Sequence, residues 1–457
     1  MTRGVDRTQV PAPGALRPFN FPVIDRARLS NGLPLLVART DHLPVVTMAA
    51  ILPAGGVKEI SARAGLARFT SSLLESGAGG RTALQIAEAA EGLGVRMESS
   101  ASWDRTLVGY TGLSTRTRAA SEILEQLICS PDFPAAEVKR LRNEQLAEIV
   151  QRRAEPRGLA NEMAARFMYA EDAPYSRPLG GTPASIRNLT KADAEAFHSS
   201  NYTPNGAALI VAGAMDASEA MDLAEARFGG WAGPAAIRPV VNVETRHGDP
   251  QVIIVNRPGS VQSEIRIGHL GVGRTSPDYF PLIVMNTVLG GAFSSRLNLN
   301  LREANGFTYG VSSSFSMRRD PGLFLVSTAV QTEVTADAVT EILREIDGIR
   351  AGPVTASELV DARNYLAGTF PLRLQTTHGI ASRLAELVIY GLPDDYFASY
   401  RDRILEVEDA EILRVARENI RPDELTLVIV GDADAIRSSL EALDLGIIET
   451  VDPATLP

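Results

Sequence analysis

The sequence predicts an α+β protein made of two similar, duplicated domains, each a sheet covered by helices on one face. Three observations lead to this prediction: the length of the chain, an internal repeat, and the grouping of strand and helix patterns. The chain has 457 residues, which is too long for one ordinary hydrophobic core. Its 45% apolar and 22% charged residues are typical of a soluble globular protein.

The internal repeat is the strongest of these observations. Residues 201–213 align without gaps on residues 419–431, an offset of 218, and each segment runs from a Pro turn into a short apolar strand that ends at Gly. A second match, at an offset of 221, places residues 142–143 on residues 363–364. Two copies of this size are too few and too large for a solenoid, so the pattern favours duplication of a whole domain.

The two copies are expected to occupy residues 25–232 and 250–447. A Gly- and Pro-rich stretch that starts at Gly229 is the expected linker between them. We refer to these units below as the first copy and the second copy.

Strand and helix patterns in the first copy are grouped rather than strictly alternating. Apolar or alternating runs predict strands at 33–39, 45–52, 95–100 and 106–113. Helical spacing of apolar residues predicts helices at 63–75, 82–93, 116–128 and 135–153, the second of them capped by Thr82. This grouping favours an α+β arrangement with helices on one sheet face.

Charge and hydropathy narrow the classes of partner. The net charge of −10 argues against a nucleic-acid partner, which would need a basic face. The longest apolar runs stop well short of the ~20 residues that a membrane-spanning helix needs. Residues 1–22 lack the apolar core of a signal peptide. We therefore expect a cytoplasmic protein without a membrane span, or a periplasmic one if the start codon is misplaced or an export signal has been trimmed.

Cysteine and histidine usage argues against a metal site. Cys129 is the only cysteine, so it can form neither an intrachain disulfide nor a Cys-based zinc knuckle. No two of the five histidines are close enough in sequence to share a helix face, and each is expected to be an isolated surface or capping residue. These histidines are His42, His198, His247, His269 and His378.

Residues 65–77 have the apolar scaffold of an active-site helix. The segment resembles the zinc helix of the pitrilysin/insulinase-type peptidases, which include the mitochondrial processing peptidases and read G-L-A-H-F-x-E-H-x-x-x-x-G. In that family two His bind zinc, and the Glu between them activates water. Here Arg68, Ser71 and Ser72 stand at the three positions. Arg cannot be deprotonated to act as a ligand, and Ser is a poor ligand and base.

The resemblance extends over about residues 25 to 445. Matching positions in the same order are Asn31-Gly32-Leu33, Gly55, Glu59, Gly65, Tyr175, Gly180 and Leu189-Thr190. The family's third zinc ligand is a Glu on a later helix, and Glu148 is its match, one residue short by count. Without two imidazoles a lone carboxylate cannot hold zinc, so Glu148 is expected to be a relic or a helix-surface residue. The resemblance also implies that the two domains form half of a clamshell.

A second family motif lies in the second copy. Residues 290–309 resemble G-G-x-x-S-S-R-L-x-x-x-L-R-E-x-x-G-x-x-Y, in which the second Arg and the Tyr hold the substrate backbone and the developing oxyanion. The resemblance assigns these substrate-binding roles to Arg302 and Tyr309, whose guanidinium and phenol are suitable donors. The alternative is that Arg302 pairs with Glu303 and Tyr309 simply starts a strand.

These features lead to a prediction of a non-catalytic subunit in a heterodimeric zinc metallopeptidase. The chain would have no catalytic residue and bind no metal or other cofactor itself. A homologous subunit containing H-x-x-E-H would hold the zinc, and Arg302 and Tyr309 would bind the peptide substrate. The main alternative is a structural or assembly protein like the core subunits of the cytochrome bc1 complex. A stand-alone peptidase with other metal ligands is a third reading.

Overall fold

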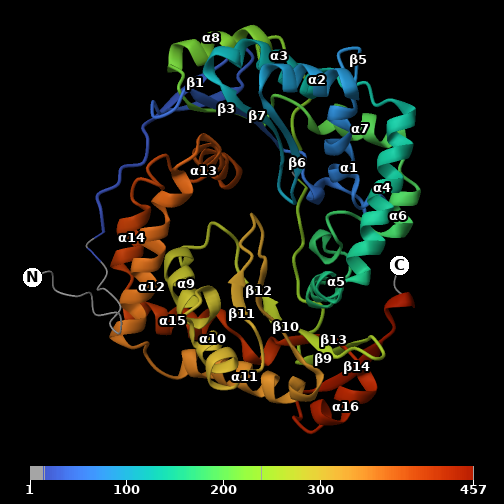
Figure 1. Ribbon diagram of the computed structural model, residues 1–457, viewed down its shortest axis with the longest axis vertical. Helices are drawn as coiled ribbons and strands as arrows, with labels where there is room; N and C mark the ends of the chain where they lie inside the picture. Colours follow the sequence, from blue (N-terminus) through green and yellow to red (C-terminus); the bar gives the residue numbers. More distant parts are fainter. Residues whose placement is uncertain (1–13, 15, 238, 456–457) are drawn as a thin grey trace, which may run out of the picture.

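The computed structural model describes residues 14, 16–237 and 239–455, which form two α+β units stacked on one another (Figure 1). The expectation about a signal peptide rests partly on residues 1–13 and 15, which lie outside the described residues. Within the described part, no helix is both long and apolar enough to cross a bilayer.

In the described part of the chain, the first copy contains eight strands and eight α-helices. Its strands are β1 (Ile24–Arg28), β2 (Pro34–Arg39), β3 (Val45–Leu52), β4 (Gly77–Ala78), β5 (Arg81–Thr82), β6 (Arg96–Ala101), β7 (Thr106–Leu113) and β8 (Ala208–Gly213). Its helices are α1 (Leu66–Leu73), α2 (Ala83–Leu93), α3 (Thr117–Cys129), α4 (Ala135–Ala154), α5 (Pro156–Met168), α6 (Pro183–Arg187), α7 (Lys191–Asn201) and α8 (Ala217–Phe228).

Over residues 239–455, the second copy also has eight α-helices but six strands, and its last strand extends beyond residue 447. Its strands are β9 (Gln251–Asn256), β10 (Gln262–Leu270), β11 (Val311–Phe315), β12 (Leu323–Gln331), β13 (Thr426–Gly431) and β14 (Ile447–Val451). Its helices are α9 (Tyr279–Asn286), α10 (Arg296–Asn298), α11 (Thr335–Ala351), α12 (Ala356–Thr369), α13 (Thr377–Tyr390), α14 (Tyr400–Glu406), α15 (Asp409–Asn419) and α16 (Ala433–Glu441).

The two main sheets have the same internal strand order. The first runs β1-β2-β8-β3-β7-β6, and the second runs β11-β12-β10-β13-β9-β14. When the second sheet is read from its other end, β9-β13-β10-β12-β11 corresponds to β2-β8-β3-β7-β6 of the first. The corresponding pairs β2–β8 and β9–β13 are both parallel. The duplication read from the sequence is therefore also a duplication of sheet topology. Only the last edge strand differs, because β1 precedes its sheet in the chain whereas β14 follows it.

The predicted helix starts depend on local capping. Thr82 begins α2 through a capping box with Gln85, and Gly94 ends it in the left-handed region with a φ of 64°. The first predicted helix is shorter than expected, since α1 covers only Leu66–Leu73 between 3-10 turns. The described residues between α8 and β9 form no helix or strand, as expected of a linker.

One helix of each copy packs on the sheet of the other copy. Helix α5 contacts β10 and β13 of the second sheet, and α13 contacts β3 and β8 of the first (Figure 1). The two helices start at residues 156 and 377, which are related by the repeat offset of 221. Each sheet thus has its own helices on one face and a helix of the other copy on the opposite face. The sequence prediction had assigned helices to one face only.

We call α5 and α13 the exchanged helices, and α5 is anchored by apolar side chains. Leu159, Met163 and Phe167 of α5 are buried against Ile253 and Val428 of the second sheet. Burial of a Leu or Phe side chain contributes about 1.5–3 kcal/mol. The exchange therefore makes each copy depend on the other for part of its core.

Candidate functional site

Helix α1 is positioned by a buried carboxylate that precedes it in the chain. Glu59 is 9% exposed and accepts hydrogen bonds from the backbone N–H groups of Gly65 (2.9 Å) and Ala67 (2.6 Å). These are two of the N–H groups that a helix start leaves without intrahelical partners. Burial raises the pKa of the Glu59 carboxyl to about 7.

Gly65 is required at the start of α1 by its backbone conformation. Its φ of 91° lies in the left-handed region, and a Cβ here would stand 2.6 Å from Cδ1 of Ile186. The family-like residues Glu59 and Gly65 therefore have a structural explanation that is independent of any metal.

Arg68 and Glu148 face each other across α1 and α4. Nη2 of Arg68 lies 2.5 Å from Oε2 of Glu148, and the two side chains are 38% and 43% exposed. Glu148 was expected to be a relic or a helix-surface residue; the structure gives it a partner at the first position of the degenerate motif. At this exposure the ion pair contributes on the order of 1 kcal/mol or less.

The two serines of the degenerate motif differ in environment. Ser71 is buried, and its hydroxyl lies 2.8 Å from that of Ser99 on β6. Oγ of Ser99 also donates to the backbone carbonyl of Ser71 at 2.9 Å. Ser72 is exposed. The position of the family's general base therefore holds a neutral hydroxyl pair that ties α1 to the edge strand of the sheet.

These donors do not fit a zinc ion. A guanidinium stands where a neutral imidazole is needed, and the carboxylate that would be the third ligand is already paired with it. In residues 14, 16–237 and 239–455, no three His, Cys, Asp or Glu side chains are grouped so that they could hold a metal ion. We therefore derive no chemistry through a metal held by this chain.

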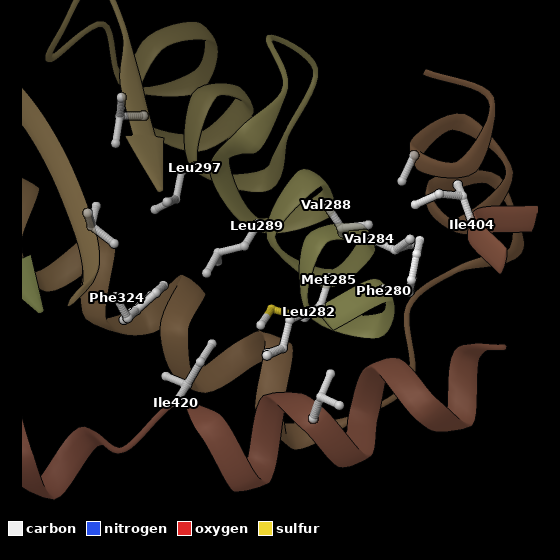
Figure 2. Packing of buried hydrophobic residues seen from close by; sticks show 14 of the residues in the cluster. Phe280, Leu282, Val284, Met285, Val288, Leu289, Leu297, Phe324, Ile404 and Ile420 are labelled. Carbon is white, nitrogen blue, oxygen red and sulfur yellow. The ribbon is translucent and has the colours of Figure 1, made fainter. Parts of the chain in front are cut away.

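The second motif is organised by two π-helical segments, Thr287–Gly291 and Leu299–Ala304. Such segments are rare and often occur at functional sites. Figure 2 shows Leu289 and Leu297 beside Phe324 in the core of the second copy, where all three are fully buried. The segment that carries the motif is therefore packed against the core through its buried leucines.

Arg302 and Tyr309 lie at the surface of this segment. Tyr309 is 96% exposed and precedes β11 by two residues. Nη1 of Arg302 lies 3.4 Å from Oε1 of Glu303, yet this nitrogen is buried and makes no hydrogen bond within the described residues. Arg302 therefore pairs with Glu303, as in the alternative reading, whereas Tyr309 precedes β11 and is not part of it.

Sequence reasoning missed Phe293, which holds Arg302 in place. The Arg302 guanidinium carbon lies 4.1 Å from the centre of the Phe293 ring, and this ring is itself exposed. A cation–π contact of this kind orients the guanidinium without using any of its hydrogen-bond donors. The only sequence signal was the position of Phe293 in the glycine-rich stretch, where the family pattern is unspecified.

The edge of β11 beside the motif is closed by side-chain amides. Asn298 donates to the carbonyl of Val311 at 2.8 Å and accepts from its N–H at 3.2 Å. Asn286 donates to the carbonyl of Ser313 at 2.9 Å. Three backbone groups of this edge are therefore occupied, which hinders its pairing with another strand.

Two clefts lie on the inner faces of the sheets, beside the exchanged helices. The larger has a volume of about 1130 Å³ and is lined by β3, β6 and β7 together with the start of α13, including Thr47, Glu98 and His378. The smaller, of about 540 Å³, is lined by α5, β10, β11, β12, the glycine-rich stretch and Tyr309. We call the smaller one the α5 cleft.

Two of the histidines, expected to be isolated surface or capping residues, are buried or half-buried and contact backbone groups. His269 is buried, with Nδ1 2.9 Å from the carbonyl of Leu270 and Nε2 accepting from the N–H of Arg421 at 3.1 Å. Burial lowers the pKa of His269 to about 4. Burial also lowers the pKa of His198, whose Nε2 lies 2.8 Å from the carbonyl of Ile128. Both imidazoles satisfy backbone groups.

The duplicated fold and the two motifs are those of the zinc-peptidase class, with Arg68, Ser71 and Ser72 in the segment that resembles its zinc helix. Family comparison agrees. The sequence-family model described as Insulinase (Peptidase family M16) matches residues 36–182. The family model described as Peptidase M16 inactive domain matches residues 188–366. The chain belongs to the insulinase, or M16, peptidase family.

Relatives and solved structures resemble the chain over most of its length. A protein of Mycobacterium leprae named as an uncharacterized zinc protease is 27% identical over 364 residues, covering 79% of this chain and 81% of the relative. The mitochondrial-processing peptidase subunit beta of Lentinula edodes is 23% identical over 436 residues, covering 91% of each. The crystal structure of a peptidase M16 inactive domain from Pseudomonas fluorescens matches with a TM-score of 0.84 at 24% identity, covering 90% of this chain and 98% of that one. The structural match supports the α+β fold.

Proposed function

We propose that this chain is the non-catalytic subunit of a heterodimeric zinc metallopeptidase. It contributes Arg302 and Tyr309 to the active site of a homologous partner that contains H-x-x-E-H. The observation that carries this proposal is the contrast between the two motifs. Arg68 and Ser71 of α1 are engaged in pairs within the chain. By contrast, Tyr309 is 96% exposed, and Nη1 of Arg302 makes no hydrogen bond with the described residues.

The proposed roles follow from the chemistry of the two groups. The guanidinium of Arg302, oriented by Phe293, donates to a carbonyl of the bound peptide backbone. The phenol of Tyr309 donates its proton in a hydrogen bond to the oxyanion that develops at the cleaved carbonyl. The partner supplies the nucleophile and the metal, so this chain alone is inactive.

The division into residues 25–232 and 250–447 belongs to the same proposal. Because α5 and α13 are exchanged, neither copy has a complete core by itself. The pair of copies therefore acts as one half of the closed chamber, facing the partner as a unit.

The experiment is reconstitution with a homologous subunit that contains H-x-x-E-H. The mixture is expected to cleave a quenched fluorescent peptide that neither subunit cleaves alone. Tyr309→Phe is expected to lower kcat about 100-fold, in the range seen when one oxyanion donor is removed. Tyr365→Phe, a half-exposed tyrosine on α12, is the matched control and is expected to leave kcat unchanged.

Two results would contradict the proposal. The first is a pair whose activity is unaffected by both Tyr309→Phe and Arg302→Ala, which would favour a structural role like that of the bc1 core subunits. The second is about one tightly bound zinc per purified chain together with proteolysis in the absence of any partner.

A further inference from the structure

The α5 cleft contains a charged cluster beside Tyr309, in which Glu264 and Arg266 are buried and Arg157 is exposed. Its floor is formed by Glu264 and Arg266 of β10, and its wall by Arg157 and Asn161 of α5. Buried charges need close partners, since removing an ion from water costs several kcal/mol. The partners of each group therefore show which charges are satisfied within the chain.

Arg266 is almost fully buried, but not all of its hydrogen-bond donors are engaged within the described residues. It is 2% exposed, and Nε donates to Oδ1 of Asn161 at 2.8 Å. Nη1 donates to the carbonyl of Ile265 at 2.9 Å and lies 2.9 Å from Oε2 of Glu264. Among the described residues Nη2 makes no hydrogen bond, although Arg266 lines the cleft. A donor of a buried guanidinium is thus available to a ligand.

The cluster has one positive charge in excess. Glu264 balances one of the two guanidinium groups; its other oxygen, Oε1, lies 3.8 Å from Nε of Arg157. Arg157 is 76% exposed at its side chain, so it can turn towards a ligand in the cleft. Two arginines against one glutamate favour an anionic ligand over a cationic one.

The duplication provides an internal comparison for this cluster. Glu264 lies opposite Val430 on β13, and Thr47 lies opposite Ala212 on β8. The repeat aligns Ala212 with Val430, so Thr47 of the first copy takes the place of Glu264. Thr47 uses its hydroxyl to contact the exchanged helix, at 2.7 Å from Oγ1 of Thr377.

By the same register, Ala49 of the first copy takes the place of Arg266. The fold therefore packs an exchanged helix on this strand with a Thr and an Ala, and does not require the ion pair. A buried ion pair is in any case weak evidence for a stabilising role, because the cost of desolvating both charges offsets much of their attraction. The charged cluster occurs only in the copy that also carries Arg302 and Tyr309.

We propose that the α5 cleft binds a carboxylate of a peptide ligand, through Nη2 of Arg266 and the guanidinium of Arg157. The carboxylate is either an acidic side chain or the carboxyl terminus of the peptide. Its place in peptide hydrolysis, next to the bond that Tyr309 would contact, rests on the proposed function. The binding itself does not, because every group involved belongs to this chain.

The test measures peptide binding by the purified full chain without a partner. Dye-labelled peptides of about ten residues, whose other side chains are uncharged, carry either Glu or Gln at one position. Each is made with a free or an amidated carboxyl terminus. We expect roughly tenfold tighter binding, by fluorescence anisotropy at low salt, for peptides with a suitably placed carboxylate. The Glu/Gln pair and the acid/amide pair separate the two sources of carboxylate.

Two variants test the residues. Glu264→Thr with Arg266→Ala copies the first copy and leaves the net charge unchanged, and Arg157→Gln removes the exposed arginine. Each is expected to reduce the preference for a carboxylate roughly threefold, and the triple variant to abolish it. Arg140→Gln, on the surface of α4, removes the same charge elsewhere and is expected to keep the preference.

The proposal is wrong if Glu and Gln peptides and acid and amide peptides all bind equally to the wild-type chain, or if none of them binds. It is also wrong if the triple variant keeps the preference, or if Arg140→Gln loses it. Should the double variant fail to fold, as judged by its melting temperature, Arg157→Gln decides alone. Failure of the proposed function would be recognised separately, as activity of the reconstituted pair that does not respond to Tyr309→Phe.

Discussion

The buried carboxyl of Glu59 offers the sharpest test of how α1 is held. Its folded pKa is about 7, against 4.5 in the unfolded chain, because burial disfavours the ionised form. Between pH 4.5 and 7 the folded state therefore binds more protons than the unfolded state. Stability from this group is fully present below pH 4.5, falls as the pH rises, and is lost above pH 7. The difference corresponds to about 3 kcal/mol.

The perturbation is Glu59→Gln, which removes the titration and keeps the shape of the side chain. The free energy of unfolding of the wild type relative to this variant should fall by about 3 kcal/mol between pH 4.5 and pH 8. Urea unfolding followed by tryptophan fluorescence measures it, because both tryptophans, Trp103 and Trp231, lie in the first copy with Glu59.

Glu358→Gln is the matched control, since Glu358 also caps a helix but has the opposite shift. Its pKa is lowered to about 2, mainly by the hydrogen bond from Arg296, so its contribution is present above pH 4.5 and is lost towards pH 2. This variant should leave the slope above pH 4.5 unchanged. Parallel curves for the wild type and Glu59→Gln would refute the reasoning. They would mean that the two N–H groups at 2.9 and 2.6 Å outweigh burial and keep the carboxylate ionised.

Three further perturbations follow from the structure. The double variant Arg68→His, Ser72→His should bind about one zinc per chain, measured by metal analysis after dialysis. Arg68→His alone should bind none, because two imidazoles one helical turn apart are needed. An unchanged metal content in the double variant would contradict this prediction. Leu159→Ala in the exchanged helix α5 should lower the free energy of unfolding by about 2–5 kcal/mol, against less than about 0.5 kcal/mol for exposed Val150→Ala on α4. Because burial lowers the folded pKa of His269 to about 4, the wild-type free energy of unfolding should fall by about 3 kcal/mol between pH 6.5 and pH 4. His269→Gln should lack this fall. Equal falls in both proteins would show that the protonation of His269 is not its cause.

Local patterns in the sequence were sufficient for most of the elements predicted in the first copy. The strands predicted at residues 45–52 and 106–113 coincide with β3 and β7, because alternation and continuous apolar runs report directly on burial. The start of α2 at Thr82 follows from a capping box within four residues. The repeat at an offset of 218 also anticipated that the two sheets would share one strand order.

The sequence alone therefore determined the fold class and the duplication. Only the tertiary structure decided which surfaces meet. No helix was predicted at α5, and local sequence patterns do not show that the sheet of the other copy covers it. In the same way, the partners of Arg68, Arg302 and Arg266 lie where folding brings elements together, and hydrogen bonding and ion pairing depend on those distances in space rather than on spacing along the chain.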